Sequence, residues 1–508
     1  MRALCAALLA CILLPACGSG HGRSGSNPTA SPTTNPAGPT TSEAAHSTTA
    51  APAPSIAWNV CPTHAGWECG SMSVPLDHRH PGETISLALT RHRAGVPAER
   101  VGSLLVNPGG PGASGIDFAY QIANLPALAS LVRDFDLVGF DPRGVGASTP
   151  IHCVDGPTLD RINHVDPTPD TAARLAAVID VAKQLAAGCQ AQSARLLPHV
   201  STIDAAKDME DIRVALGDPT LTYMGFSYGT LLGATYANLY PTKVRAMMLD
   251  AAVDPAIDEG AMSMAQAVGF EQNLNAFLAS CTASCAFKAH GAPTLRAAFD
   301  NLMARIRSAP IPAGTRSLGP GEALLGVAEP LYSQAQWPNL AIALERAWDG
   351  DGSGLMQLND AYMGRRADGT FDNSLEANTA INCLDHPVPS SIAGFQQLAA
   401  AAAKQAPFFG PPLAWGAIAC LYWPVPPVSK PGPVKAAGAP PIVVIGTTGD
   451  PATPYAWAEH LTSEFDDGIL VTRDGDGHGA YLQSQCVRNA LDAYLIKLVK
   501  PVALTCAT

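Results

Sequence analysis

The chain has 508 residues, of which 47% are hydrophobic and 15% are charged, and its formal net charge is −12. This composition supplies enough apolar side chains for a large core, and the length predicts one enlarged domain or a domain with a long insertion. The acidic balance and the lack of basic runs argue against nucleic-acid binding, so we expect no nucleic-acid partner.

The first residues resemble an export signal. One arginine precedes an apolar run that ends at Ala16, and this run is too short to form a stable membrane anchor. The sequence Leu14-Pro15-Ala16-Cys17 resembles the lipobox of bacterial lipoproteins, in which the cysteine becomes the lipid-modified N-terminus. We therefore expect a signal peptide over 1–16 and a membrane anchor through a lipid on Cys17, with a plain secretory signal as the alternative.

The segment that follows, 17–55, consists mainly of Ser, Thr, Pro, Gly and Ala. Such a segment cannot bury enough apolar surface to fold, so we predict a flexible tether between a membrane and a folded body. The expected location is the cell envelope, either as a membrane lipoprotein or as a secreted protein.

The cysteine content agrees with export. Of the 13 cysteines, Cys5, Cys11 and Cys17 lie near the N-terminus, which leaves ten in the remainder of the chain. An even number predicts disulfides, and pairing of neighbours along the chain is the simplest arrangement, although the sequence leaves the connectivity open. Cys281 and Cys285 have no second pair with metal-ligand spacing, and HExxH, P-loop and dinucleotide motifs are absent from the sequence. We expect no metal and no cofactor.

Short apolar runs that end in turns rich in Gly, Asp or Pro recur along the chain. They lie at 102–112, 135–148, 221–230, 244–255, 440–454 and 468–481. Helical patterns separate several of them, which predicts a parallel sheet covered on both faces, with functional loops at the carboxyl ends of the strands. An earlier segment predicts a strand hairpin around Pro81-Gly82.

About 190 residues separate the apolar run ending at Asp250 from the one beginning at Ile442, which is too long for a loop. The patterns within this segment are mostly helical. We predict an inserted helical cap over 255–431, between two parts of one sheet domain at 56–254 and 432–508. A second, independent domain is the alternative.

Residues 221–230 read LTYMGFSYGT and contain the pattern G-x-S-x-G around Ser227. In this pattern the serine lies on a sharp turn between a strand and a helix, with its hydroxyl exposed at the helix N-terminus. The glycines are expected because side chains at their positions would collide with neighbouring backbone. An apolar run precedes the motif and a segment with helical spacing follows it, so we predict that Ser227 is a nucleophile.

A serine nucleophile needs a base, and the base needs an acid that orients it. Asp450 follows an apolar strand, and His478 lies in a glycine-rich loop near the end of the chain. We predict Asp450 as the acid and His478 as the base. Asp474 and Asp476 are alternatives for the acid, and His460, which lies in a helical pattern, is the alternative for the base.

An oxyanion hole should combine a backbone N–H after the nucleophile with another from an early strand-end loop. Tyr228 supplies the first. The sequence NPGGPG, Asn107 to Gly112, follows an early apolar strand and is the expected source of the second, because glycines allow the backbone to approach a substrate carbonyl closely. An ordinary tight turn is the alternative.

Six motifs occur in a characteristic order: NPGGPG, FDLVGFDPRGVGAS, GFSYGT, MMLDAAVDP, GDPATP and GHGAY. Together they resemble the tripeptidyl-aminopeptidase-like family of α/β-hydrolase serine peptidases, from about Trp58 to the C-terminus. This family includes secreted actinobacterial aminopeptidases and mycobacterial cell-envelope serine proteases. The resemblance implies an α/β-hydrolase fold, with a mostly parallel, doubly covered sheet and an inserted, largely helical cap.

The resemblance also implies roles for particular residues. By motif match, the nucleophile, acid and base are Ser227, Asp450 and His478. The oxyanion donors implied are Gly110 and Tyr228, with Gly109 as the alternative to Gly110. Members of the family act on peptides with a free N-terminus, although some act within proteins. Related prolyl aminopeptidases carry a histidine where this chain has Pro108, which we expect to affect substrate choice rather than chemistry.

Three functions are compatible with these motifs. The first is a serine aminopeptidase or protease, and the second is a carboxylesterase or lipase, because the same triad cleaves esters. The third is a non-catalytic envelope protein that retains the fold. An aminopeptidase needs carboxylates near the nucleophile to hold the substrate ammonium, and Asp254, Asp258 and Glu259 follow a strand end. We favour the first function, with a peptide substrate and a monomeric enzyme.

Overall fold

The computed structural model describes residues 54–281 and 283–507. The predicted signal peptide at 1–16, the predicted lipid attachment at Cys17 and nearly all of the predicted tether at 17–55 lie outside the described residues. In the part that the structure describes, no helix is both long enough and apolar enough to cross a bilayer.

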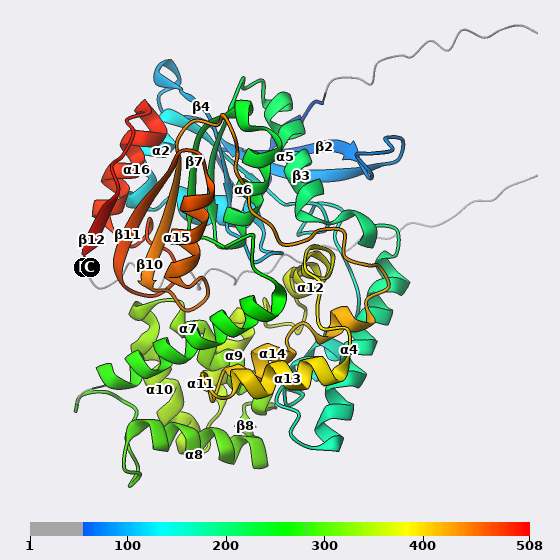
Figure 1. The fold of residues 1–508 in the computed structure, drawn as a ribbon, viewed down its shortest axis with the longest axis vertical. Coiled ribbons are helices and arrows are strands. Elements are labelled where there is room, and N and C mark those ends of the chain that lie inside the picture. The colour runs from blue at the N-terminus through cyan, green and yellow to red at the C-terminus, as the bar shows by residue number, and fades with distance from the viewer. Residues whose placement is uncertain (1–53, 282, 508) are drawn as a thin grey trace, which may run out of the picture. The chain divides into compact units, whose positions relative to one another are not determined.

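A ten-stranded sheet in the order β1-β2-β3-β5-β4-β6-β7-β10-β11-β12 organises the described residues (Figure 1). The strands are β1 (Ala57–Val60), β2 (Trp67–Pro75), β3 (Thr84–His92), β4 (Gly102–Asn107), β5 (Phe135–Phe140), β6 (Leu221–Phe226), β7 (Val244–Asp250), β10 (Ile442–Gly449), β11 (Gly468–Asp476) and β12 (Leu504–Ala507). Neighbours from β5 to β12 pair in parallel. The first three strands form an antiparallel edge, which contains the predicted hairpin.

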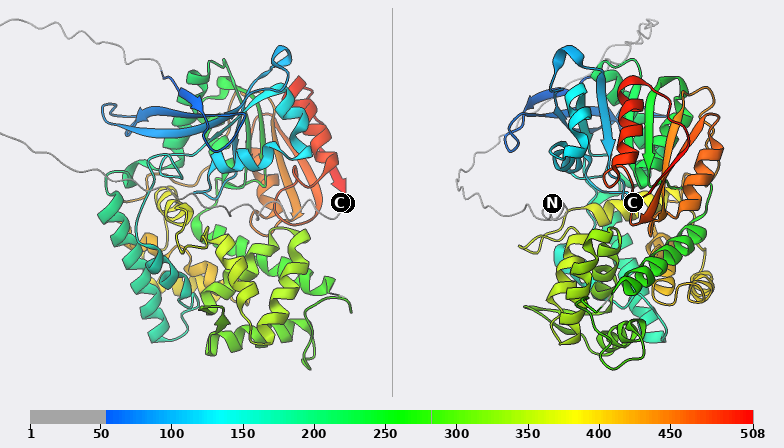
Figure 2. Two further views of the ribbon diagram at one scale, coloured as in Figure 1. Left: turned by 180° about the vertical axis from the view of Figure 1, so that it is seen from behind. Right: turned by 90° about the vertical axis from the view of Figure 1, so that its left-hand side faces the viewer.

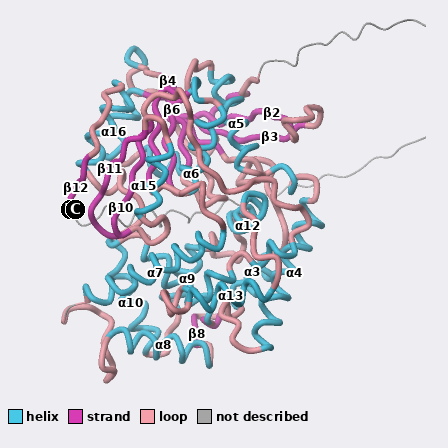
Figure 3. The backbone as a smooth tube through the Cα atoms, in the orientation of Figure 1, coloured by secondary structure: helices cyan, strands magenta, loops and turns pink. Residues whose placement is uncertain are grey.

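Helices cover both faces of this sheet (Figures 2 and 3). One face is covered by α1 (Gly115–Ala123), α2 (Ala129–Asp134) and α16 (Gln485–Lys497), and the other by α5 (Thr202–Leu216), α6 (Tyr228–Leu239) and α15 (Tyr455–Glu464). Adjacent residues of the buried strands alternate between the two cores: Tyr223 packs with the α5 side, whereas Met224 packs with the α16 side. Burial on both faces explains the continuous apolar runs. The predicted α/β-hydrolase fold, with a mostly parallel sheet covered on both faces, is confirmed.

The chain between β7 and β10 is mostly helical and has its own core. It contains α7 (Glu259–Ser280), α8 (Leu295–Ser308), β8 (Ile311–Ala313), β9 (Arg316–Leu318), α9 (Pro320–Leu331), α10 (Trp337–Trp348), α11 (Ser353–Tyr362), α12 (Ser374–Asp385), α13 (Ile392–Ala402) and α14 (Gly410–Trp415). Leu274, Phe299 and Leu340 are fully buried within it. We call residues 251–441 the inserted segment. Cap boundaries at 255 and 431 stay a prediction.

Two helices from before β6, α3 (Gly156–His164) and α4 (Ala172–Ser193), also reach the inserted segment. The first packs on α9, and the second packs on a short 3₁₀ helix, η7 (Ile418–Tyr422). The other 3₁₀ turns are η2 (Pro97–Glu99), η3 (Pro126–Leu128), η4 (Leu197–His199), η5 (Pro241–Lys243) and η6 (Gln334–Gln336). The sequence patterns did not predict that the segment between β5 and β6 also packs against the inserted segment.

Five disulfides join the ten cysteines that follow the N-terminal segment, each to its neighbour along the chain. The pairs are Cys61–Cys69, Cys153–Cys189, Cys281–Cys285, Cys383–Cys420 and Cys486–Cys506. The predicted disulfides, and the simplest pairing, are confirmed.

The loops that these disulfides close differ in length, and so should their contributions to stability. The Cys153–Cys189 pair spans 36 residues and the Cys281–Cys285 pair spans 4. Loop-closure entropy gives about 4 and about 2 kcal/mol respectively. Replacing the first pair by alanines should therefore lower the free energy of unfolding, measured in urea, by more than replacing the second. Equal losses, or the reverse order, would contradict this account.

Candidate active site

Ser227 lies at the turn between β6 and α6 with φ 54° and ψ −126°. Positive φ is strained for a residue with a side chain and is common at functional sites. A Cβ atom on Gly225 would lie 2.4 Å from the carbonyl oxygen of Gly229, and one on Gly229 would lie 2.8 Å from the carbonyl oxygen of Asn107. The two glycines therefore allow close backbone packing around the turn, as the motif predicts.

The buried residue Asp250, at the end of β7, connects this turn to the loop that carries His478. Its carbonyl oxygen accepts a hydrogen bond from Ser227 N at 2.9 Å. Its carboxylate accepts hydrogen bonds from Ala480 N at 3.0 Å and from Tyr481 N at 2.7 Å. Burial raises the pKa of Asp250 to about 6, against the opposing effect of these backbone donors. One residue thus positions two segments that are far apart in the sequence.

His478 and Asp450 are brought together by the loops after β10 and β11. His478 Nδ1 lies 2.9 Å from Asp450 Oδ1 and 3.0 Å from Oδ2. The Asp450 side chain is fully buried and also accepts hydrogen bonds from Thr453 N at 2.9 Å and Gly479 N at 3.2 Å. Burial lowers the pKa of His478, but attraction and hydrogen bonding to Asp450 outweigh it, and the net shift is upward.

The alternative acids and the alternative base lie elsewhere. Asp474 accepts a hydrogen bond from the Thr448 hydroxyl at 2.9 Å. His460 pairs instead with Asp254, at 2.9 Å between Nδ1 and Oδ2. Within residues 54–281 and 283–507, His478 forms no ion pair with Asp474 or Asp476, and no hydrogen bond joins it to the Ser227 hydroxyl. Catalytic hydrogen bonds of this kind are often long before substrate binds.

The NPGGPG loop lies directly against the serine turn. A Cβ atom on Gly109 would lie 2.9 Å from Tyr228 N, so the loop backbone adjoins the first N–H of α6. Gly109 N already donates to Asn107 Oδ1 at 2.9 Å. In the part of the chain that the structure describes, the Gly110 N–H has no such acceptor. This difference favours Gly110 over Gly109 as a donor to a bound oxyanion.

Comparisons with known proteins agree with this geometry. Residues 102–306 match the family model described as alpha/beta hydrolase fold, and residues 406–506 match the one described as TAP-like protein. Serine protease Hip1 of Mycobacterium tuberculosis is 38% identical over 449 residues, covering 84% of this chain and 85% of Hip1. Tripeptidyl aminopeptidase of Streptomyces lividans is 32% identical over 455 residues, covering 87% and 84%.

The chain belongs to the tripeptidyl-aminopeptidase-like family of α/β-hydrolases. This confirms the resemblance predicted from the six motifs and shows a hydrolase, which excludes the non-catalytic alternative. Carboxylesterase B of Mycobacterium tuberculosis is also similar, at 37% identity over 483 residues, covering 90% of each chain. The family membership therefore leaves the choice between peptide and ester bonds to the details of the site.

In this α/β-hydrolase the inserted segment contacts the histidine loop through Tyr332, the C-cap residue that follows α9. Tyr332 O accepts a hydrogen bond from His478 N at 2.8 Å, and its ring packs edge-on against the imidazole with centroids 5.3 Å apart. Burial raises the pKa of the Tyr332 phenol well above its usual range, and the neighbouring Tyr362, followed by the carboxylates of Asp450 and Glu329, raises it further. The end of α9 is therefore part of the wall around His478.

Glu329 lies one helical turn before Tyr332 and was not predicted as a site residue. In the described part of the chain, its buried Oε2 atom has no hydrogen-bond partner. Burial raises the pKa of its carboxyl to about 7. A buried carboxylate oxygen without a donor is costly unless it serves a ligand. The signal in the sequence is an acidic residue within an otherwise apolar stretch, Leu324 to Leu331.

The three acids predicted near the nucleophile have other partners. Asp258 is the exposed N-cap of α7 and accepts a hydrogen bond from Ala261 N at 2.8 Å. Glu259 accepts one from the Ser263 hydroxyl at 3.2 Å, and burial raises its pKa to about 7. Asp254 pairs with His460. The raised pKa of Glu259 is that of a buried carboxyl that a bound cation would stabilise.

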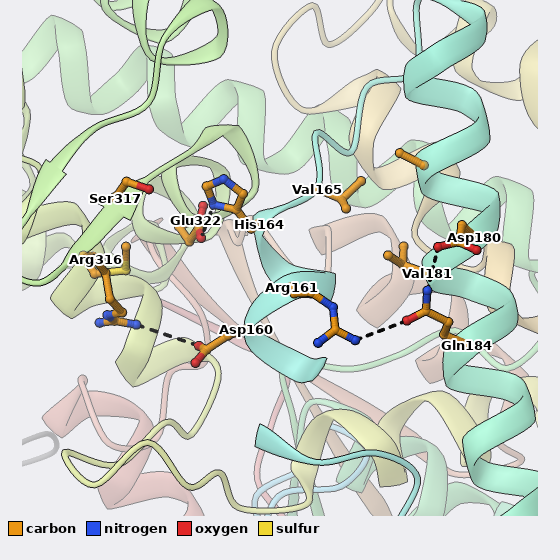
Figure 4. Close-up of a pocket in the computed structure, with 12 residues that line it drawn as sticks. Asp160, Arg161, His164, Val165, Asp180, Val181, Gln184, Arg316, Ser317 and Glu322 are labelled. Atoms are coloured by element: carbon orange, nitrogen blue, oxygen red, sulfur yellow. Dashed lines mark hydrogen bonds and ion pairs between the residues drawn. The ribbon is translucent and has the colours of Figure 1, made fainter. Parts of the chain in front are cut away.

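A cavity of about 590 Å³ lies apart from this chemistry (Figure 4). It is formed by α3, α4, β9 and α9, and an ion pair between His164 and Glu322, at 2.8 Å, lies in its wall. Among the described residues that line it, neither Ser227 nor His478 occurs. The catalytic chemistry therefore places the candidate site at the serine turn rather than at this cavity.

The two carboxylates proposed for the acid role can be distinguished by substitution. Asp450→Asn should lower kcat/KM by about 10⁴, because the imidazole loses the carboxylate that fixes its tautomer. Asp474→Asn should leave kcat/KM near that of the parent, since Asp474 contacts Thr448 rather than His478. Both variants should show the circular dichroism spectrum of the parent. A larger loss of kcat/KM in Asp474→Asn than in Asp450→Asn would show that Asp450 is not the acid.

Proposed function

We propose that this chain is an exported serine peptidase that cleaves short peptides, or the N-termini of longer ones, through a covalent acyl-enzyme. Ser227 is the nucleophile, His478 the general base and Asp450 the acid that orients it. The observation that carries this proposal is the pairing of His478 with the buried Asp450, on a loop held by the same Asp250 that holds Ser227. Two of the named relatives, a serine protease and a tripeptidyl aminopeptidase, support a peptide bond as the bond that is cleaved.

The reaction follows from these positions. His478 Nδ1 is occupied by Asp450, so Nε2 is the nitrogen that takes the proton from the Ser227 hydroxyl as its oxygen attacks the substrate carbonyl. The N–H groups of Gly110 and Tyr228 then hold the negative oxygen of the tetrahedral intermediate. The proton passes from His478 to the leaving amine. Water, deprotonated by His478, releases the acyl group and restores Ser227.

Glu329 is our candidate for the carboxylate that holds the free amino group of the substrate. Its unpaired oxygen lies in the inserted segment, one turn from the tyrosine that contacts His478. An ammonium group would supply the missing donor, and such a charge-assisted hydrogen bond contributes about 1.5–3 kcal/mol. Asp258 is a weaker candidate because it is exposed and caps a helix. Glu259 remains the second candidate.

A carboxylesterase is the second candidate function, and the similarity to carboxylesterase B favours it. An ester substrate without an amino group would gain nothing from Glu329, which gives the two functions different responses to the same substitution.

Export and anchoring belong to the same proposal. Five disulfides fit an oxidising compartment, in which such bonds persist. A lipid on Cys17 would hold a monomeric enzyme at the cell envelope through the tether at 17–55. Its partners would then be the membrane and a peptide substrate, without nucleic acid.

Replacing the nucleophile tests the central role. Ser227→Ala should lower kcat by about 10⁶, the usual cost of losing the nucleophile of a triad, and should abolish labelling by a fluorophosphonate probe. Ser463→Ala, at an exposed serine of α15, should retain activity and labelling and so serves as the control. Substantial turnover by purified Ser227→Ala would remove the assignment.

Glu329→Gln should lower kcat/KM for a short peptide with a free N-terminus by at least about tenfold, equivalent to about 1.4 kcal/mol, and should leave the N-acetylated peptide unaffected. The carboxyl has a pKa of about 7, so it becomes ionised as the pH rises through that value. The preference of the parent for the free peptide should therefore rise from about pH 6 to a maximum near about pH 7.4, midway between this pKa and the ordinary value of about 7.7–8.0 for a peptide amine, and should decline at higher pH as the substrate amine loses its proton.

The matched variants Asp258→Asn and Glu259→Gln complete this experiment. Both should retain the preference for the free peptide if Glu329 holds the ammonium group. Loss of the preference in Glu259→Gln alone would transfer the role to that residue. Equal turnover of free and acetylated peptides by the parent would contradict the proposed aminopeptidase activity and would leave an endopeptidase or an esterase.

A further inference from the structure

A second cluster of polar side chains lies at the C-terminal end of α15, whereas the Asp450 loop precedes the first turn of that helix. Asp254, His460 and Glu464 each offer one possible ligand atom, and these atoms lie within 4.8 Å of one another. His460 Nδ1 is 2.9 Å from Asp254 Oδ2 and 3.7 Å from Glu464 Oε1. His460 and Glu464 are four residues apart and so share one face of the helix.

Backbone donors hold both carboxylates in place. Asp254 Oδ1 accepts a hydrogen bond from Ala256 N at 2.9 Å, and Glu464 Oε2 accepts one from Val434 N at 3.1 Å. Hydrogen bonds of this kind orient the ligands of metal sites. The Glu464 side chain is only 6% exposed, yet within the described residues its Oε1 atom has no hydrogen-bond partner. A buried carboxylate oxygen that faces the cluster without a donor points to a ligand.

We propose that Asp254, His460 and Glu464 bind one divalent transition-metal cation of the Zn²⁺ type. One imidazole nitrogen and two carboxylate oxygens form a ligand set that zinc accepts, with a fourth position left for water. The His460 side chain is 51% exposed, so water can reach the cluster. The double positive charge balances the two carboxylates, and the last turn of a helix favours a cation.

In a comparable cluster elsewhere, the negative charge of a carboxylate is neutralised in a different way. His78, Asp208 and Asp211 are equally close together, but Arg143 donates to both oxygens of Asp208, at 2.6 and 2.7 Å. That carboxylate is therefore neutralised by a guanidinium. Among the described residues, no arginine or lysine forms an ion pair with Asp254 or Glu464. A metal cation would supply the missing charge.

The position of the cluster indicates a structural role. Asp254 lies just after β7, where the chain enters the inserted segment, and Val434 lies where the chain returns towards β10 (Figure 1). The two connections between the sheet and the inserted segment contact each other here, because Gly432 N donates a hydrogen bond to the carbonyl oxygen of Pro255 at 2.9 Å. A cation bound here would join α15 to both of these connections and so stabilise the attachment of the inserted segment to the sheet.

The test uses the full chain without a histidine tag, stripped with EDTA and dialysed. Zn²⁺ should bind at one equivalent by isothermal titration calorimetry and should raise the melting temperature as its concentration increases. Glu464→Gln keeps an oxygen for the Val434 N–H, and His460→Ala alters an exposed side chain, so both variants should fold. Each should weaken Zn²⁺ binding by at least about tenfold, the smallest loss expected even for an orienting residue.

His80→Ala is the matched control, because His80 pairs with one carboxylate, Asp77, at 3.0 Å, and lies outside the two three-residue clusters. It should bind Zn²⁺ as the parent does. Parent-like affinity in both Glu464→Gln and His460→Ala would overturn the proposal, as would a parent that binds no Zn²⁺. In either event His460 bridges two carboxylates as an ordinary ion pair. This site is separate from Ser227, so its failure leaves the proposed peptidase untouched.

Discussion

The arrangement of the candidate active site depends on the hydrogen bonds made by one buried carboxylate, that of Asp250. The main-chain carbonyl of Asp250 holds the serine turn, and the carboxylate of the same residue holds the loop that follows His478. A buried carboxylate of raised pKa is unfavourable by itself, and the two backbone donors compensate for part of that cost. Because β7 lies between β6 and β10, its end is the natural point from which both loops can be positioned.

The inserted segment completes the site instead of merely covering it. Tyr332 at the end of α9 contacts His478, and Asn378 of α12 donates to the carbonyl oxygen of Pro111 in the NPGGPG loop at 3.0 Å. A Cβ atom on Gly112 would lie 2.4 Å from the carbonyl oxygen of Ser374, so this loop packs closely beneath α12. In the function that we propose, the sheet supplies Ser227, Asp450 and His478, and the inserted helices supply part of the wall around them.

Much of this arrangement could be predicted because the signals are local. The glycines around Ser227, the apolar runs before Asp450 and His478, and the spacing of the cysteines all reside within short stretches of sequence. The hydrogen bonds of Asp250, the pairing of His460 with Asp254, and the packing of α3 on α9 could not be predicted. Each depends on which residues distant in sequence become neighbours, and a single sequence does not encode this in any local pattern.

The disulfide connectivity has a consequence for biosynthesis. Every pair joins a cysteine to the next one along the chain, and the widest pair is 37 residues apart. A polypeptide that crosses a membrane N-terminus first presents each cysteine to its native partner before any later cysteine arrives. Oxidation in order of emergence therefore yields the native set directly. In the exported protein that we propose, this connectivity would require a thiol oxidant on the far side of the membrane and little exchange of wrongly paired sulfurs.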